Sequence, residues 1–221
     1  KEFFEDMEAK GGPKNTYVGE LYFSAHRGTY TAQAMVKQKN RQNELALREM
    51  EMWASAAKLG GWNYPLERAD GLWKELLLHQ FHDILPGSSI ARVYVEAEKA
   101  HEEIHKGAEE IKADALKALL GEKSEAVTVF NSLSFSRKAL VELPDAYSEG
   151  ACLADGSYVP VGRTREGVKA LVTLPSCGAI SLRPAACPDE AAGATIRKTD
   201  NGFVMENEVL TAAVDGRGEV T

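Results

Sequence analysis

Apolar positions in the first half of the chain recur at steps of three and four residues, the spacing of one buried helix face. The first series consists of Ala46, Met50, Trp53 and Ala57. It predicts a helix from about Thr31 to Leu59, with Gly60-Gly61 as its stop. The second series consists of Leu66, Ala69, Trp73, Leu76 and Gln80. It predicts a second helix, with Pro65 in its first turn and Pro86-Gly87 at its end.

A third, longer series keeps the same steps. It consists of Ile90, Val93, Ala97, Ala100, Ile104, Ala108, Ile111, Ala115 and Leu119. Lys and Glu fill the outward positions of this helix, Ser88 or Ser89 is its expected N-cap, and Gly121 is its expected end. Three such helices with short connections bury their stripes against each other or against another domain, and we expect a three-helix bundle.

After Glu125 the apolar positions alternate, which is typical of strands. The expected strands are Val127–Phe130, Leu140–Leu143, Lys169–Leu174, Ile180–Leu182, Thr195–Thr199, Phe203–Glu206 and Leu210–Asp215. Turn residues separate them at Pro144-Asp145, Asp155-Gly156, Pro175-Ser176 and Asn201-Gly202, and Pro184–Gly193 is expected to be a loop. We therefore predict an α+β fold in two domains, a three-helix bundle followed by an incomplete antiparallel β-sandwich.

Composition narrows the classes of function. The chain has 221 residues, and its 26 basic and 33 acidic residues give a net charge of −7, which argues against a nucleic-acid partner. It has no apolar run long enough to cross a bilayer, so we expect no membrane partner. Cys152, Cys177 and Cys187 form no C-x-x-C pair, which favours free thiols in a reducing, cytoplasmic location. The chain begins at Lys1 and ends in a strand-like stretch, so we expect a piece of a longer protein.

Phosphate-loop, dinucleotide-binding, zincin and nucleophile-elbow motifs are absent from the sequence. His101 and His105 lie four residues apart on the third predicted helix, a spacing that a two-ligand metal face would have. The neighbouring glutamates, Glu98, Glu102 and Glu103, instead favour a solvated charged face.

Two further segments carry candidate chemistry. His26-Arg27-Gly28 could place cationic donors near an anion or a sugar hydroxyl, but a turn followed by a helix capped by Thr29 or Thr31 is the favoured interpretation. The segment from His79 to Ser89 places His82 and Asp83 at the end of an apolar helix. These two residues are either a metal ligand with an adjacent carboxylate, or a local cap in which Asp83 accepts from amides and His82 lies in the core.

These segments, Gly19–Tyr22 through His26–Thr31 and above all Leu76–Ser89, resemble the middle domain of the class II α-mannosidases, glycoside hydrolase family 38. Asn40-Arg41, Val129–Phe135 and Asn207–Leu210 fit the same family. The resemblance implies that residues 1–17 are the tail of an N-terminal α/β barrel and residues 18–121 the helical middle domain. Residues 125–221 would then begin the C-terminal β-sandwich domain.

The resemblance also implies a function, that of part of a zinc-dependent retaining α-mannosidase acting on mannose-containing oligosaccharides. In that family the histidine at the position of His82 binds zinc and the aspartate at the position of Asp83 contacts mannose. His26 and Arg27 align with a substrate-facing segment. Both catalytic carboxylates belong to the barrel, so no catalytic residue is expected in this chain. We expect the chain alone to be inactive and to bind zinc weakly.

Two other classes of function remain open at this point. The β half could be a non-catalytic carbohydrate-binding module, although it is poor in aromatic residues. The long third helix could instead make the chain a helical protein-interaction module.

Overall fold

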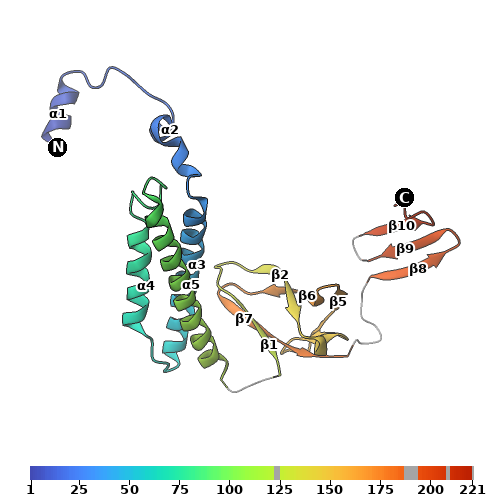
Figure 1. The fold of residues 1–221 in the computed structure, drawn as a ribbon. Helices are drawn as coiled ribbons and strands as arrows, with labels where there is room; N and C mark the ends of the chain where they lie inside the picture. Colours follow the sequence, from blue (N-terminus) through green and yellow to red (C-terminus); the bar gives the residue numbers. More distant parts are fainter. Residues whose placement is uncertain (122–124, 187–193, 208–209, 221) are drawn as a thin grey trace. The chain divides into compact units, whose positions relative to one another are not determined.

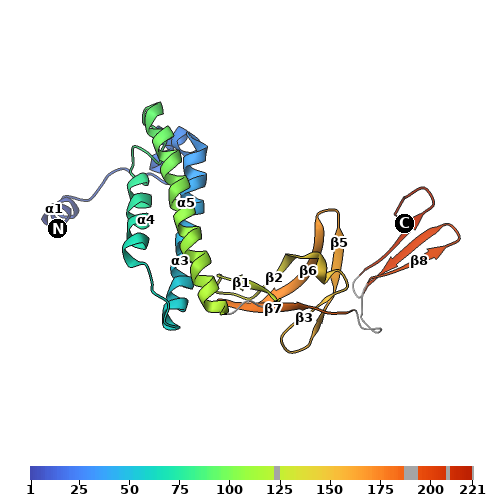
Figure 2. The same cartoon turned by 60° about the horizontal axis from the view of Figure 1, so that its bottom comes forward.

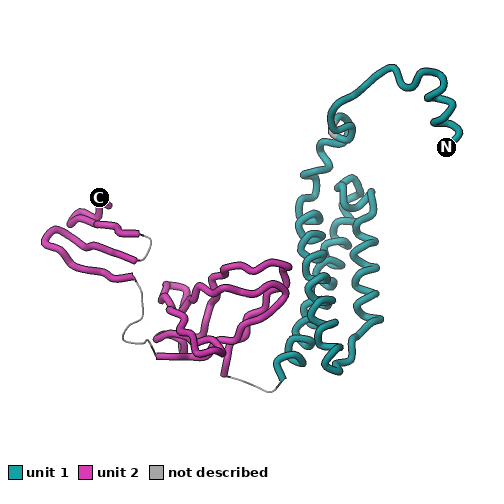
Figure 3. The backbone as a smooth tube through the Cα atoms, turned by 180° about the vertical axis from the view of Figure 1, so that it is seen from behind, with its two compact units in different colours: residues 1–121 teal, residues 122–221 magenta. Residues whose placement is uncertain are grey.

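The structure is a computed structural model, and it describes residues 1–121, 125–186, 194–207 and 210–220. The chain divides into two compact units, Lys1–Gly121 and Glu122–Thr221 (Figure 3). The described part of the first unit is helical, and that of the second is built mainly of strands (Figure 1). Over these residues the fold is α+β, with five α-helices and three antiparallel sheets.

Three long helices form the centre of the first unit. They are α3 (Ala34–Leu59), α4 (Leu66–His79) and α5 (Ala91–Leu120), and they lie side by side (Figures 1 and 2). Their shared core consists of Ala46, Leu47, Met50, Ala54, Ala57, Ala69, Leu76, Ile104, Ala108, Ile111 and Ala115. Gly107 lets α4 and α5 approach closely, because a Cβ atom at this position would lie 2.8 Å from Cδ2 of Leu72.

The helix ends differ in part from the prediction. Gly60 ends α3 as expected, and its amide donates to the carbonyl of Ala57. The same helix begins at Ala34 because Gln33 has a left-handed backbone, with φ of 50°. The expected serine cap on α5 is wrong: Ile90 precedes that helix and makes no side-chain cap.

Short helices precede α3 in the chain. They are α1 (Glu2–Ala9), α2 (Leu21–His26) and the 3₁₀ turn η1 (Arg27–Tyr30). The carboxylate of Glu20 caps α2 by accepting from the amide of Tyr22 at 3.1 Å. Helices this short have too few periodic apolar positions to be predicted from the hydrophobic pattern.

The strands of the second unit form three antiparallel sheets. The first has the order β1 (Val127–Asn131), β7 (Gly178–Pro184), β3 (Ala151–Cys152) and β4 (Tyr158–Val159). The second has the order β2 (Arg137–Leu143), β6 (Gly167–Leu174) and β5 (Val161–Thr164). The third has the order β10 (Thr211–Asp215), β9 (Gly202–Glu206) and β8 (Thr195–Thr199).

The first two sheets contribute to one apolar core. It consists of Leu143, Tyr147, Ala151, Val159, Val168, Ala170, Val172, Leu174 and Leu182. Tyr147 lies in the short 3₁₀ turn η2 (Asp145–Tyr147), and its buried hydroxyl accepts from the amide of Val127 at 3.0 Å. That hydroxyl also lies 2.8 Å from the carbonyl of Leu182, so it ties η2 to β1 and β7.

Every strand predicted from the alternating pattern is present, and the strand expected at Leu140–Leu143 begins earlier, at Arg137. β3, β4 and β5 were not predicted, because two of them have only two residues and Val161–Thr164 lacks an apolar alternation. Of the loop expected at Pro184–Gly193, Pro184 closes β7, and residues 187–193, with Cys187, lie outside the described residues. No helix in the described ranges combines the length and apolar character needed to cross a membrane.

Candidate functional site

The segment between α4 and α5 is a compact loop that packs on the start of α3. Gly87 has a φ of +88°, and a Cβ atom at its position would lie 2.7 Å from the carbonyl oxygen of Ala32. Only glycine fits both the backbone angle and the close approach. The prediction that the second helix ends at Pro86-Gly87 is wrong, because α4 already ends at His79. Gly87 instead seats the following loop against the chain before α3.

His82 and Asp83 point away from the helical core at the top of this loop. Their side chains are 80% and 63% exposed, and Nε2 of His82 lies 3.7 Å from Oδ1 of Asp83. The ring of Phe81 lies against that of His82, with the ring centroids 4.3 Å apart. The local-cap interpretation is therefore wrong. Within the described chain no amide donates to the Asp83 carboxylate, whose only ion-pair partner is His82.

Polar side chains of α3 hold the start of the loop. The side-chain amide of Gln80 donates to Oδ1 of Asn40 at 3.1 Å and to Oε1 of Glu44 at 3.0 Å. Asn40 in turn donates to Glu44 at 3.1 Å. Gln80 was predicted to lie on the apolar face of the second helix, and its contacts show that the stripe ends in a polar cluster.

Lys37 holds the far side of the loop. Its ammonium donates to the carbonyl oxygens of Ala32 at 2.6 Å and of Leu85 at 2.8 Å. Burial lowers the pKa of this ammonium group from its ordinary value. The loop that carries His82 is thus fixed on both sides by hydrogen bonds to α3 or the residues before it, while His82 itself stays exposed.

His26 and Arg27 lie where α2 meets the 3₁₀ turn η1. The His26 ring stacks on Tyr22, with centroids 4.5 Å apart and planes at 19°. The hydroxyl of Thr29 donates to the His26 carbonyl at 2.6 Å, so the segment is a turn, as expected. The expected threonine cap is wrong, because Gln33 is the residue before α3.

One cavity joins the two predicted site segments. It measures about 370 Å³ and is lined by Tyr22, Thr29, Tyr30, Lys37, Asn40, Leu85 and Pro86. The first three residues belong to the His26–Arg27 segment, and the last two belong to the loop after α4. The four predicted site side chains are not part of its lining, so the structure brings the segments together but not these side chains.

His82 and Asp83 could supply one ligand to a metal ion, but they do not form a complete metal site. An imidazole beside a carboxylate suits zinc or another borderline cation. The described residues contain no group of three His, Cys, Asp or Glu side chains that could hold a metal ion. A cation bound at His82 would therefore need further ligands from outside the described residues.

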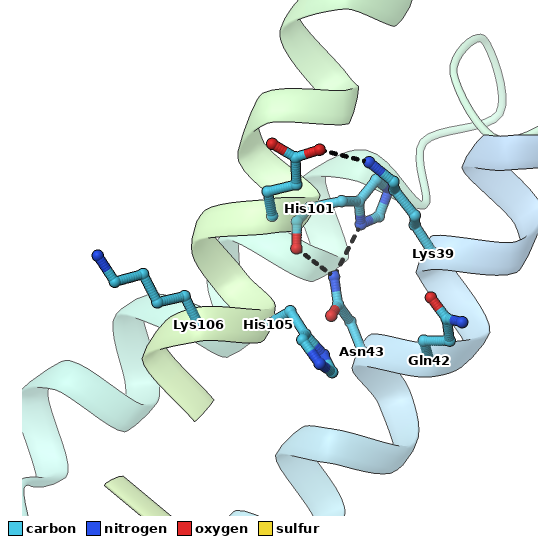
Figure 4. A pocket seen from close by; sticks show the side chains of 7 residues that line it. Lys39, Gln42, Asn43, His101, His105 and Lys106 are labelled. Atoms are coloured by element: carbon cyan, nitrogen blue, oxygen red, sulfur yellow. Dashed lines mark hydrogen bonds and ion pairs between the residues drawn. The ribbon is translucent and has the colours of Figure 1, made fainter. Parts of the chain in front are cut away.

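His101 lies in the core, so its expected place on a solvated charged face is wrong. Its side chain is 1% exposed and lines a cavity of about 190 Å³ between α3 and α5 (Figure 4). The side-chain amide of Asn43 donates to Nδ1 of His101 at 3.1 Å and to its carbonyl at 2.9 Å. His105, one turn further along α5, is exposed as predicted.

Burial and the nearby charges set the protonation state of His101. Lys39 pairs with Glu98 at 3.1 Å and with Glu102 at 2.8 Å at the edge of the cavity. Burial above all, helped by the nearby His79 and Lys39, lowers the pKa of His101 to about 4. The imidazole of His101 is therefore neutral at pH 7.

Sequence reasoning missed the residues that support the loop. Asn40 and Asn43 continue the buried stripe of α3 at helical spacing from Leu47, and both are buried. Polar residues within an otherwise apolar stripe are the signal that could have indicated a buried network. No such signal marks Lys37, because its partners are backbone carbonyls brought close only by the fold.

The known proteins that this chain resembles in sequence are alpha-mannosidases. Residues 24–119 match the alpha mannosidase middle domain family. Human alpha-mannosidase 2C1 is 29% identical over 230 aligned residues, which cover 100% of this chain and 20% of that protein. Alpha-mannosidase G of Dictyostelium discoideum is 43% identical over 103 residues, which cover 47% of this chain and 10% of that protein.

A solved structure shares the fold. A protein of glycosyl hydrolase family 38 from Enterococcus faecalis matches 99% of this chain and 33% of its own, with a TM-score of 0.53 and 19% identity. The chain spans about a fifth of the length of the human relative. Residues 24–119 thus match the alpha mannosidase middle domain family, and the whole chain is similar in sequence to alpha-mannosidases.

Proposed function

We propose that this chain is part of a zinc-dependent retaining α-mannosidase, in which it supplies one metal ligand and substrate contacts. The observation that carries the proposal is the adjacent, exposed pair of His82 and Asp83 on a loop whose two sides are fixed. A surface histidine on a mobile loop would lose conformational entropy on binding a metal. A fixed loop has already lost most of it.

His82 would supply one imidazole nitrogen to the zinc, and the Asp83 carboxylate beside it would accept hydrogen bonds from sugar hydroxyls. When bound, zinc would hold vicinal hydroxyls of mannose as a Lewis acid. Retaining hydrolysis also needs two carboxyl groups about 5–5.5 Å apart, a nucleophile and an acid that becomes a base. We assign both to an N-terminal α/β barrel, so the chain alone is inactive in this proposal.

Apolar side chains near the pair support contact with that barrel. Leu77 and Leu78, near the end of α4, are 58% and 59% exposed, and Phe81, directly before His82, is 49% exposed. An exposed apolar patch beside exposed polar groups is typical of a surface that another domain covers. In this proposal residues 1–17 are the tail of the barrel. Residues 18–121 form the three-helix middle domain, which contacts the surface of the barrel.

Substrate would reach the same region from the side of α2. His26 and Arg27 are the proposed substrate contacts there, and the cavity of about 370 Å³ beside them has aromatic and hydroxyl groups in its lining. Aromatic faces and hydroxyl groups are the usual partners of sugar rings and sugar hydroxyls. A mannose-containing oligosaccharide is the substrate class that we propose.

The second unit would begin the C-terminal β-sandwich domain at residues 125–221. Its first two sheets already share one apolar core, which supports a two-layer arrangement. Cys152 and Cys177 are free, which supports the cytoplasmic location proposed from the cysteines.

The test uses the full-length protein and compares His82→Ala with His105→Ala. Both histidines are exposed in the helical unit, and only His82 lies in the loop. We expect His82→Ala to lose bound zinc and to lower kcat/KM for an aryl α-mannoside by about a hundredfold or more. His105→Ala should keep both the zinc and the activity. Full zinc and full activity in His82→Ala would exclude the proposed role of the loop.

A further inference from the structure

Two buried histidines meet where α4 contacts α5. His79, the last residue of α4, is 7% exposed, and His101 of α5 is 1% exposed. Their ring centroids lie 5.3 Å apart, with planes at 45°. Neither residue belongs to the proposed zinc and substrate contacts, yet burying two imidazoles is costly unless their nitrogens find partners.

The partners of His101 fix its neutral form. The side-chain nitrogen of Asn43 must face the His101 carbonyl at 2.9 Å, because a carbonyl oxygen only accepts. The same nitrogen lies 3.1 Å from Nδ1, which therefore accepts its second hydrogen. Nε2 of His101 then carries the proton of the neutral ring.

The partner of His79 places a proton on Nε2 of that ring. Nε2 of His79 lies 3.3 Å from Oε1 of Glu75, and a carboxylate only accepts, so Nε2 carries the proton. The two remaining ring nitrogens are Nδ1 of His79 and Nε2 of His101. Both are buried without a hydrogen-bond partner in the described structure. In a neutral His79 ring Nδ1 is an acceptor, and Nε2 of His101 is a donor, so two neutral rings are complementary.

The pair adjoins the loop that carries the proposed site. Gln80 directly follows His79 and is bonded to Asn40 and Glu44, and His82 lies three residues after His79. We propose that His79 and His101 are positioning residues: as a neutral, complementary pair they hold the end of α4 and keep His82 and Asp83 in place. Only the last step, from loop position to metal and sugar binding, rests on the proposed function.

Proton uptake would break this complementarity. A protonated His101 would turn its Nδ1 into a donor that faces the donor nitrogen of Asn43. The surrounding charged groups are Lys39 and Glu44 of α3, Glu75 of α4, and Glu98, Glu102, His105 and Lys106 of α5. Burial lowers the pKa of His101 to about 4, so this ring resists protonation until the pH falls well below 6.5. The end of α4 should then loosen at acid pH.

The first test measures tautomers in the wild-type protein. Nitrogen-15 NMR of the full-length protein at pH 7 should show both rings neutral, each with its proton on Nε2. A positively charged ring at pH 7, or a proton on Nδ1 of either ring, would overturn the proposal. This result does not depend on mannosidase activity.

The second test measures hydrogen exchange of amides 80–89 at pH 7 and pH 5, corrected for intrinsic rates. Glutamine can accept and donate as a neutral imidazole does but does not titrate, so the variant is His79→Gln with His101→Gln. We expect exchange to speed up about tenfold at pH 5 in wild type and in the control His105→Gln. The double variant should change less than twofold, and the single variant His101→Gln should lie between the two.

Equal acceleration in the wild type and in both glutamine variants would overturn the proposal, as would no acceleration in wild type. Zinc content and hydrolysis of an aryl α-mannoside are measured on the same samples. If the pH-dependent exchange follows the pair but neither zinc nor hydrolysis is detected, the proposed function fails and the positioning pair stands.

Discussion

The two units bury polar side chains in different ways. In the β unit, Asn131 is 4% exposed, and its amide donates to the carbonyls of Phe135 at 3.0 Å and of Pro175 at 2.7 Å. Its carbonyl oxygen accepts from the amide of Leu133 at 3.3 Å. In the helical unit, His79 and His101 each keep one buried nitrogen without a partner in the described structure.

The difference teaches what each polar site does. Asn131 is satisfied by backbone groups that have no charge to gain, so it fixes the turn after β1 at every pH. In our proposal the two histidines are complementary only while both rings are neutral, and they lie next to an exposed loop. A buried polar group with fixed backbone partners gives stability, whereas a titratable pair makes the same kind of stability depend on pH.

Replacing Asn131 has the largest expected effect on stability. Asn131→Leu leaves the carbonyls of Phe135 and Pro175 without their donor, and we expect the free energy of unfolding of the β unit to fall by about 3 kcal/mol. Urea unfolding followed by far-UV circular dichroism measures this change. Asn201→Ala, in an exposed turn, should change it by less than about 0.5 kcal/mol. A loss no larger than in that control would show that Asn131 does not hold the turn.

Lys37→Met should have the next largest effect, in the helical unit. The substitution keeps the apolar stem but leaves the carbonyls of Ala32 and Leu85 without the ammonium, so we expect a loss of about 2 kcal/mol. Urea unfolding followed by tryptophan fluorescence reports on this unit, because all three tryptophans lie in it. Lys99→Met, exposed on α5, is the matched control. Equal losses in the two variants would contradict the role of Lys37.

Lowering the pH should reduce the free energy of unfolding of the helical unit by a similar amount. His101 has a folded pKa of about 4 against an ordinary value of 6.5, so the unfolded state binds more protons between these values and stability falls as the pH falls. From pH 7 to pH 5 we expect a loss of about 2 kcal/mol, since one pKa unit is worth about 1.4 kcal/mol. His101→Gln should remove most of this loss in urea titrations at the two pH values, and an unchanged loss would exclude His101 as its source.

The smallest expected effect comes from Lys39→Met. The positive charge of Lys39 helps to lower the pKa of His101, so its removal should raise that pKa toward the ordinary value. Because Glu98 and Glu102 already neutralise much of this charge, we expect a rise of less than about one unit. NMR titration of the His101 ring measures it, and a fall in the pKa would contradict the electrostatic explanation.

The secondary structure was largely accessible from the sequence. The stripe of Ala46, Met50 and Ala57 predicted α3, and alternation predicted β6, because burial of one face imposes a period on the chain. The short strand β4 and the helix α2 were not predicted. β4 forms by pairing with β3, and α2 is capped by Glu20. Neither contact leaves a periodic pattern in the sequence.

The candidate site was accessible only in part. The family resemblance singled out His82 and Asp83, and the structure shows that both are exposed, which the residue types alone left open. His101 was expected on a charged surface because glutamates neighbour it in sequence, but helix periodicity turns its side chain toward Asn43. The supports of the loop come from α3, some forty residues away in the chain, and such contacts leave no local pattern.

Zinc protection of His82 against diethyl pyrocarbonate tests the site most directly, because it follows the imidazole itself. The metal-free and the zinc-loaded full-length protein are modified, and each histidine is mapped by mass spectrometry. We expect His82 to react readily without zinc and about tenfold more slowly with it, since a coordinated nitrogen is no longer a nucleophile. The exposed His105 should react equally in both samples. Equal modification of His82 with and without zinc would contradict its role as a metal ligand.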